Sequence, residues 1–214
     1  MIFFDVDHTI TRHSTGRRFV EAGYRMKQFP LRLLLHMPAF YVRYRLGFLT
    51  QADLSKEVGA IRGRTRFQLQ AIAQEAVAYS MKHDLFQQAL DTVHQLQAQG
   101  RQTAIATSSL DILVRPLAER LGMQAVIATE LEFDHDVATG RAAGAPCIGL
   151  EKRRRVLALI AQRGLSPGDC GFYTDSINDL PVLEALGTAV AVNPDPRLRR
   201  VARARGWRIE RFSR

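Results

Sequence analysis

The sequence predicts an α/β protein, with a doubly wound, Rossmann-like parallel sheet as its core and an inserted all-helical cap subdomain. Two observations predict this class. Short apolar runs alternate with helical patterns over residues 83–214, which favours parallel strands joined by helical crossovers. Residues 15–82, by contrast, show helical patterns and no convincing strand. We therefore expect a core made of residues 1–14 and 83–214 and a helical cap made of residues 15–82.

Length and composition are those of an ordinary globular chain. Its 214 residues are 46% hydrophobic and 24% charged, enough for one domain with an inserted subdomain. The two cysteines, Cys147 and Cys170, fit neither a disulfide framework nor a metal knuckle, which favours the reducing cytoplasm. The most apolar segment, residues 29–48, is interrupted by arginines and prolines and does not resemble a membrane-spanning helix.

The formal net charge of +9 is unevenly distributed. Residues 12–66 hold 12 of the 30 Lys and Arg residues but only three of the 21 Asp and Glu residues. Such a segment attracts anions, which include phosphorylated metabolites, anionic lipid headgroups and nucleic acid. The alternative is a solvated basic surface that aids solubility.

The apolar run that opens the chain predicts a buried, central strand, which ends in Asp5 and Asp7. Ligands of open α/β sheets bind beyond the carboxyl ends of the strands. Two carboxylates repel each other there unless a cation lies beside them, and Mg²⁺, which prefers oxygen ligands, is the simplest such cation. The alternative is a plain strand end that leads into a helix cap.

Helical patterns follow in the predicted cap. A first helix is expected from residue 15 and a second over about residues 31–46. Thr50 is the expected cap of a third helix, and Thr65 that of a fourth, which runs through Tyr79.

Alternating elements then form the rest of the core. Asp84 is predicted to cap a helix that ends at Gln99 and is closed by Gly100. The other expected elements are strands at 102–106, 125–128, 170–174 and 188–192, helices at 111–121 and 151–162, a hairpin over 129–143 with its turn near Thr139 and Gly140, and a last helix capped by Asp195.

Three of these strands end in polar clusters. The first ends in the two aspartates, the second in a Thr-Ser pair, and the third in a loop with two further aspartates. In a parallel sheet these ends share one edge, so that a lysine from a following helix would complete a site. The residues concerned are Asp5, Asp7, Thr107, Ser108, Lys152, Asp175 and Asp179.

Four motifs occur in chain order: Asp5-Val6-Asp7-His8-Thr9, then Thr107, then Lys152, then Asp175-Ser176-Ile177-Asn178-Asp179. In these motifs the chain resembles the haloacid dehalogenase (HAD) superfamily of phosphohydrolases. The inserted helical segment makes it similar to subfamily IB, the branch related to phosphoserine phosphatase. The resemblance extends over essentially the whole chain.

The resemblance implies a phosphatase mechanism. Asp5 would be the nucleophile and form an aspartyl-phosphate. Asp7 would act as general acid and then as general base. Thr107, the backbone N–H of Ser108, and Lys152 would bind the phosphoryl oxygens and neutralise their charge.

The resemblance also implies Mg²⁺ as cofactor. Asp5, the backbone carbonyl of Asp7, and Asp175 would hold the metal, while Asp179 would hold its waters or its ligands in place.

The cap is expected to set the substrate. An ungapped reading places Ser14 where phosphoserine phosphatases carry a substrate-binding Glu, and Glu57 near the position of their substrate-binding Arg, which argues against phosphoserine. We expect a small phosphorylated metabolite instead. Candidate substrate contacts are Arg17, Arg18, Arg62 and Arg64.

Two alternatives stay open. One is a phospholipid-phosphate phosphatase that docks on an anionic membrane surface through the basic cap, so that the protein would be cytoplasmic but peripheral at the membrane. The other is a phosphoryl-accepting or anion-binding module with little turnover. No nucleic-acid partner is expected, and the oligomeric state is left open.

Overall fold

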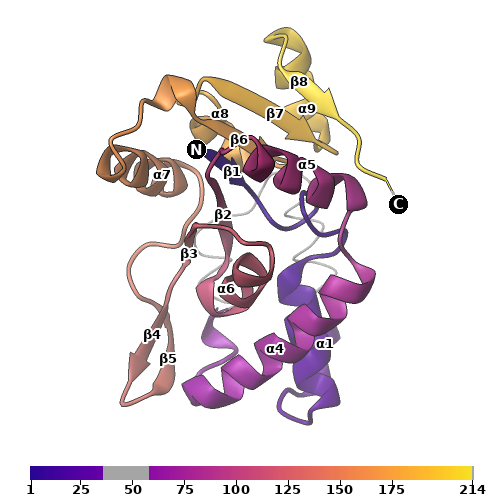
Figure 1. The fold of residues 1–214 in the computed structure, drawn as a ribbon. Helices are drawn as coiled ribbons and strands as arrows, with labels where there is room; N and C mark the ends of the chain where they lie inside the picture. Colours follow the sequence, from indigo (N-terminus) through magenta and orange to yellow (C-terminus); the bar gives the residue numbers. More distant parts are fainter. Residues whose placement is uncertain (36–57, 214) are drawn as a thin grey trace.

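A computed structural model describes residues 1–35 and 58–213. Its centre is a six-stranded sheet in which every neighbouring pair of strands is parallel (Figure 1). The order is β3-β2-β1-β6-β7-β8. The bounds are β1 Ile2–Phe4, β2 Thr103–Leu110, β3 Ala125–Thr129, β6 Gly171–Thr174, β7 Thr188–Val192 and β8 Arg208–Glu210. The predicted doubly wound α/β core is confirmed, with the first strand at its centre.

Helices pack against both faces of this sheet. The first strand shows why, because its side chains alternate: Ile2 and Phe4 join one hydrophobic cluster, and Phe3 joins the other. The first cluster includes residues of helices α5 (Gln87–Ala98) and α6 (Asp111–Arg120). The second includes residues of α7 (Leu150–Gln162), α8 (Leu180–Leu183) and α9 (Pro196–Ala204). Two short 3₁₀ helices, Pro167–Asp169 and Ile177–Asp179, precede β6 and α8.

Two long helices from the predicted cap pack against each other beyond the sheet (Figure 1). They are α1 (Thr15–Arg25) and α4 (Arg66–His83). Thr65 caps α4 as predicted, because its hydroxyl accepts from the Gln68 backbone N–H while the Gln68 side chain accepts from the Thr65 N–H. Residues 31–35 are helical, whereas the rest of the predicted second helix and the Thr50 cap lie outside the described residues. The division of the chain into core and cap stays a prediction.

Two local predictions were wrong. Asp84 does not cap α5, which begins at Gln87 without a side-chain cap; Asp84 ends α4, and its carboxylate is bound by Arg18. The hairpin of β4 (Leu131–Asp134) and β5 (Val137–Ala142) turns at His135 and Asp136, which both adopt positive φ. Gly140 lies inside β5, where a side chain would collide with Arg62.

The structure differs from the sequence prediction in two further elements of the core. β2 continues past Ala106 to Leu110, so that Thr107 and Ser108 are part of the strand rather than of the loop after it. The edge strand β8 follows α9 and was not expected from its mixed composition. Among the helices of the described ranges, none has the length and apolar character needed to cross a membrane.

Candidate active site

The ends of the three central strands bring polar side chains together. Asp5 directly follows β1, and its backbone N–H bonds to the carbonyl of Tyr173 in β6 at 2.9 Å. Thr107 lies in β2, and Asp175 directly follows β6. All three side chains are buried, with exposed fractions of 3%, 1% and 0% respectively. The order β2-β1-β6 therefore places the predicted nucleophile between a hydroxyl and a carboxylate.

Lys152 enters this cluster from the first turns of α7 and is only 2% exposed. Its Nζ lies 2.6 Å from Asp179 Oδ1 and 3.4 Å from Asp5 Oδ1. Burial alone would lower the pKa of Lys152, but the Asp179 and Asp5 carboxylates outweigh that effect and raise it. The ammonium group is therefore charged and links the ends of β1 and β6.

The pKa of Asp5 is raised although Lys152 lies beside it. Burial, together with the nearby carboxylates of Asp179 and Asp7, raises its pKa from the ordinary 3.8 to about 7. The Lys152 ammonium and a hydrogen bond from Thr107 act in the opposite direction. A further cation at this place would therefore stabilise the ionised carboxylate.

Asp179 has both carboxylate oxygens engaged. Oδ1 pairs with Lys152, and Oδ2 accepts from the Thr174 hydroxyl at 2.7 Å. The same hydroxyl accepts from the Ser176 N–H at 3.2 Å. Asp179 thus orients Lys152 toward Asp5, and Thr174 orients Asp179, a contact that the sequence pattern did not reveal.

Asp7 has different hydrogen-bond partners from Asp5. The chain reverses directly after Val6, whose carbonyl accepts from the N–H groups of residues 9, 10 and 11. The half-buried Asp7 carboxylate accepts from the Thr15 backbone N–H at 2.8 Å and from the Ser109 hydroxyl at 3.2 Å. Thr15 and Ser109 also bond to each other through their hydroxyls at 2.9 Å. Two carboxylates separated by one residue are therefore held in different environments, which suits them to different roles.

Ser109 and Thr15 were not among the predicted site residues. The polar run after Ala106 was the only signal for Ser109, and nothing in the sequence marked Thr15, because its contact comes from the start of α1. Ser108 is placed by its carbonyl, which accepts from the Thr129 hydroxyl at 2.8 Å.

The loop from Asp175 to Asp179 is held by a residue predicted only as a helix cap. Asp195 donates its N–H to the Asp175 carbonyl at 2.8 Å, and its Oδ2 accepts from the Ile177 N–H at 2.6 Å. Its Oδ1 caps α9 by accepting from the N–H groups of Arg197 and Leu198, both at 2.8 Å. Asp195 is 1% exposed, and it couples the start of α9 to the predicted metal-binding loop.

The predicted substrate arginines lie in other contacts. Arg18 forms a two-pronged ion pair with Asp84, through Nε at 2.6 Å and Nη2 at 2.8 Å. It also bonds to Glu21, as does the exposed Arg17.

The other two predicted arginines lie near the hairpin and the end of α1. Arg64 donates to the Gln28 side chain at 3.3 Å and lies over the Phe29 ring. Arg62 is exposed beside Gly140 of the hairpin. The contacts described for these four arginines do not include Asp5, Thr107 or Lys152. Their role in substrate binding therefore stays a prediction.

The donor atoms at the strand ends suit a hard cation in part. In residues 1–35 and 58–213, no three carboxylate, imidazole or thiol side chains gather closely enough to hold a metal ion by themselves. Backbone carbonyls and water are, however, common Mg²⁺ ligands, and this ion usually retains several waters beside one or two carboxylates. The excess of carboxylate over ammonium around Asp5 fits a divalent cation held in that way.

Comparison with known proteins assigns this arrangement to a family. A profile of the haloacid dehalogenase-like hydrolase family matches residues 2–184. The chain belongs to this family. It is 31% identical over 215 residues to the phosphoserine phosphatase SerB1 of Mycobacterium tuberculosis strain H37Rv, an alignment that covers 98% of this chain and 70% of the relative.

Solved structures agree with the fold. A protein of unknown function from Bordetella pertussis Tohama I superposes with a TM-score of 0.87 at 31% identity, over 98% of this chain and 97% of the other. A phosphoserine phosphatase solved as an analogue of its phospho-aspartyl intermediate superposes with a TM-score of 0.75 at 18% identity, over 100% of this chain and 93% of the other. The predicted family and enzyme class are thereby confirmed: the protein is a hydrolase of the HAD phosphatase type.

Proposed function

We propose that the protein is a Mg²⁺-dependent phosphomonoester hydrolase that works through an aspartyl-phosphate on Asp5, with a small phosphorylated metabolite as substrate. The observation that carries the proposal is the buried Lys152, which lies within 3.4 Å of Asp5 and 2.6 Å of Asp179. Burying a lysine costs free energy, and here the charge faces the one carboxylate that the family motif places at the nucleophilic position.

In the first step, an oxygen of Asp5 forms a bond to phosphorus while the bond from phosphorus to the leaving oxygen breaks. Asp7 gives its proton to the leaving oxygen. In the second step, water attacks phosphorus, Asp7 takes a proton from that water, and the bond between phosphorus and Asp5 breaks. The hydrogen bonds from Thr15 and Ser109 hold Asp7 at a fixed position for both transfers.

Negative charge on the phosphoryl group requires donors around it. We assign this role to the Thr107 hydroxyl, the Ser108 backbone N–H and Lys152, which come from β2 and α7. The Lys152 ammonium also lowers the repulsion between the approaching phosphate and the Asp5 carboxylate. Asp179 contributes by holding Lys152 in place.

Asp5, the Asp7 backbone carbonyl and Asp175 are the proposed Mg²⁺ ligands, with Asp179 beside them. Mg²⁺ supplies positive charge that offsets the repulsion between carboxylate and phosphate. Asp195 maintains this loop through the Asp175 carbonyl and the Ile177 N–H.

The substrate is proposed to be a metabolite other than phosphoserine, selected by the helical cap of residues 15–82. The ungapped reading of the sequence places Ser14 where phosphoserine phosphatases carry a carboxylate. The Ser14 hydroxyl caps α1 by accepting from the Arg17 N–H. The name of the mycobacterial relative describes that relative, and a panel of substrates has to decide between phosphoserine and other monoesters.

The test is a phosphate-release assay with Mg²⁺ on phosphorylated amino acids, amino alcohols, sugar phosphates, nucleotides and lipid phosphates. Asp5→Asn should abolish phosphate release with the fold intact. Asp169→Asn should leave phosphate release unchanged, because Asp169 is exposed and precedes β6, whereas Asp175 follows the other end of that strand. The proposal is supported if the protein prefers a soluble monoester and if EDTA abolishes phosphate release.

Three results would contradict the proposal. Full activity of Asp5→Asn would overturn the nucleophile, and a preference for lipid phosphates would favour the membrane-docking alternative. No release from any substrate by a folded protein would favour an anion-binding module.

A further inference from the structure

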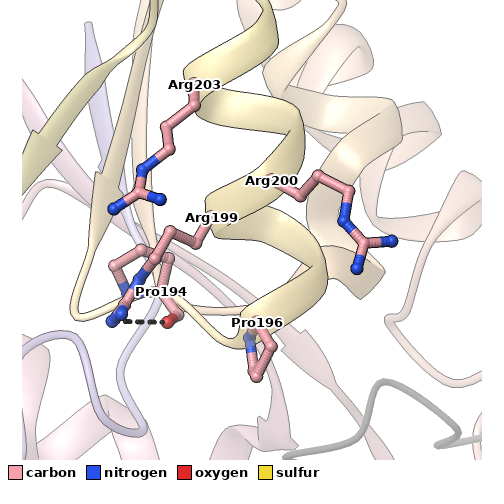
Figure 2. A pocket seen from close by; sticks show the side chains of 5 residues that line it. All are labelled: Pro194, Pro196, Arg199, Arg200 and Arg203. Atoms are coloured by element: carbon pink, nitrogen blue, oxygen red, sulfur yellow. Dashed lines mark hydrogen bonds between the residues drawn. The ribbon is translucent and has the colours of Figure 1, made fainter.

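A pocket of about 420 Å³ lies on α9, outside the residues proposed for catalysis. Its lining consists of Pro194, Pro196, Arg199, Arg200 and Arg203 (Figure 2). Its volume falls in the range of small-molecule sites, and the pocket is partly open to solvent. Three of its five lining residues are arginines, which sets its chemistry.

The arginines that line the pocket differ in their ion pairs from two arginines beside it. Arg205 pairs with Glu184 at 2.5 Å, and Arg208 pairs with Glu210. Within the part of the chain that the structure describes, Arg200 and Arg203 form no ion pair, and Arg199 makes only a 3.4 Å hydrogen bond to the Pro194 carbonyl.

Two of these charges also repel each other. Arg199 and Arg203 are four residues apart, and Figure 2 shows their side chains on the same side of α9, while Arg200 turns to the other side. Like charges at this spacing destabilise a helix. Residues 196–214 hold eight arginines and a single acidic residue, so the local sequence does little to relieve this repulsion. A bound anion would relieve it.

A phosphate group fits this lining best. Guanidinium groups donate paired, planar hydrogen bonds that match phosphate oxygens. Two guanidinium groups on one side of the helix, Arg199 and Arg203, suit a phosphate dianion better than they suit the single charge of a carboxylate. We propose that this pocket is a second anion site, which binds the phosphate group of a small molecule or of a lipid headgroup outside the catalytic centre. The proposal goes beyond the phosphatase activity and does not depend on it.

The position of the pocket connects it to the catalytic loop. Pro194 and Pro196 flank Asp195, whose N–H and carboxylate hold Asp175 and Ile177. A ligand that contacts these prolines therefore lies one residue from Asp195, which holds the proposed metal-binding loop.

The experiment is calorimetric titration of the full chain with inorganic phosphate, at low ionic strength and in EDTA. Without metal, the aspartates around Lys152 disfavour phosphate in the catalytic centre, so that binding reports the second site. The Arg199→Gln, Arg203→Gln double variant should bind phosphate about tenfold more weakly or worse, because each lost bond to a charged group is worth about that factor.

A matched control removes the same charge elsewhere. Arg120→Gln, Arg163→Gln replaces two exposed arginines on α6 and directly after α7 and should retain the wild-type affinity within about twofold. Circular dichroism confirms that each variant folds. The single variant Arg203→Gln should lose less phosphate affinity than the double variant. Three results would overturn the proposal. They are an equal loss of phosphate affinity in the two double variants, undiminished affinity in the Arg199→Gln, Arg203→Gln variant (the pocket variant), and no phosphate binding by the wild type.

Two sources of the phosphate group are then separated by sedimentation with phosphatidylcholine vesicles that contain phosphatidic acid. Vesicle binding that the pocket variant loses, together with weaker binding of inorganic phosphate, identifies a lipid headgroup site. Loss of phosphate binding alone identifies a site for a free small molecule. Both results support the anion site, and vesicle binding that survives in a variant with unaltered phosphate affinity counts against it.

Discussion

Asp195→Asn separates the two tasks of one buried carboxylate. Asp195 offers two oxygens: Oδ1 caps α9, and Oδ2 accepts from the Ile177 N–H at 2.6 Å. Asparagine has one acceptor oxygen and is about as good a helix cap as aspartate. We expect the asparagine oxygen to retain the cap, which leaves its NH₂ group facing the Ile177 N–H.

The magnitude follows from the bond that is lost. A hydrogen bond to a charged group contributes about 1.5–3 kcal/mol, and the Ile177 N–H is left beside a side chain that is only 1% exposed in the native protein. The free energy of unfolding should fall by about 2–3 kcal/mol, which lowers Tm by about 4–12 °C for a chain of this size. Asp195→Ala should cost about 1 kcal/mol more, because the cap is lost as well.

Urea unfolding followed by circular dichroism measures the free energy, and phosphate release at varied Mg²⁺ concentration measures the effect on the loop. The Mg²⁺ concentration for half-maximal activity should rise in Asp195→Asn. Asp169→Asn, at an exposed position, should change neither quantity. An Asp195→Asn protein that unfolds with the free energy of the wild type would refute the assignment of Asp195 as the clamp of this loop.

Two further predictions concern stability and thiol reactivity. Arg18→Met leaves Asp84, which is 2% exposed, without its ion-pair partner and should lower the free energy of unfolding by about 3–5 kcal/mol. Arg17→Met, which removes an exposed pair with Glu21, should change it by less than about 1 kcal/mol, and similar urea midpoints for the two variants would contradict this contrast. Burial raises the pKa of Cys147 to about 11, so about one thiol in a thousand is ionised at pH 8, and Cys170 is buried as well. An aromatic disulfide reagent at that pH should react with both cysteines in urea and with neither at a comparable rate in the native protein, and rapid reaction of one native thiol would contradict the prediction.

The sequence was sufficient to predict the core because each central strand is an apolar run that ends in polar residues. That pattern predicts that Asp5, Thr107 and Asp175 lie at one edge of a parallel sheet, and the strand order β2-β1-β6 confirms it. Lys152 looked like one member of a basic helical run, and only the family motif distinguished it from Arg153, which is exposed.

The contacts that orient these side chains could not be predicted in the same way. Ser109 and Thr15 meet at Asp7 although they lie 94 residues apart. Asp84 shows the same limit from the other direction, because aspartate favours helix caps in general, whereas its actual partner, Arg18, is 66 residues away. Local propensity carries no information about which distant residue a strand or helix end will meet.

The place of β1 in the sheet determines the order of events during synthesis. β1 is translated before the other strands of the sheet, yet its neighbours are β2 and β6, which begin at Thr103 and Gly171. At about 5–20 residues per second, its second neighbour leaves the ribosome roughly 10–30 s after β1 does. Until then an apolar strand has an unpaired edge, and Asp5 has neither Lys152 nor Asp179 nearby for most of that interval. Folding of the nascent chain is therefore governed by late, long-range pairing, and a chain that stops short of β6 cannot assemble the catalytic centre.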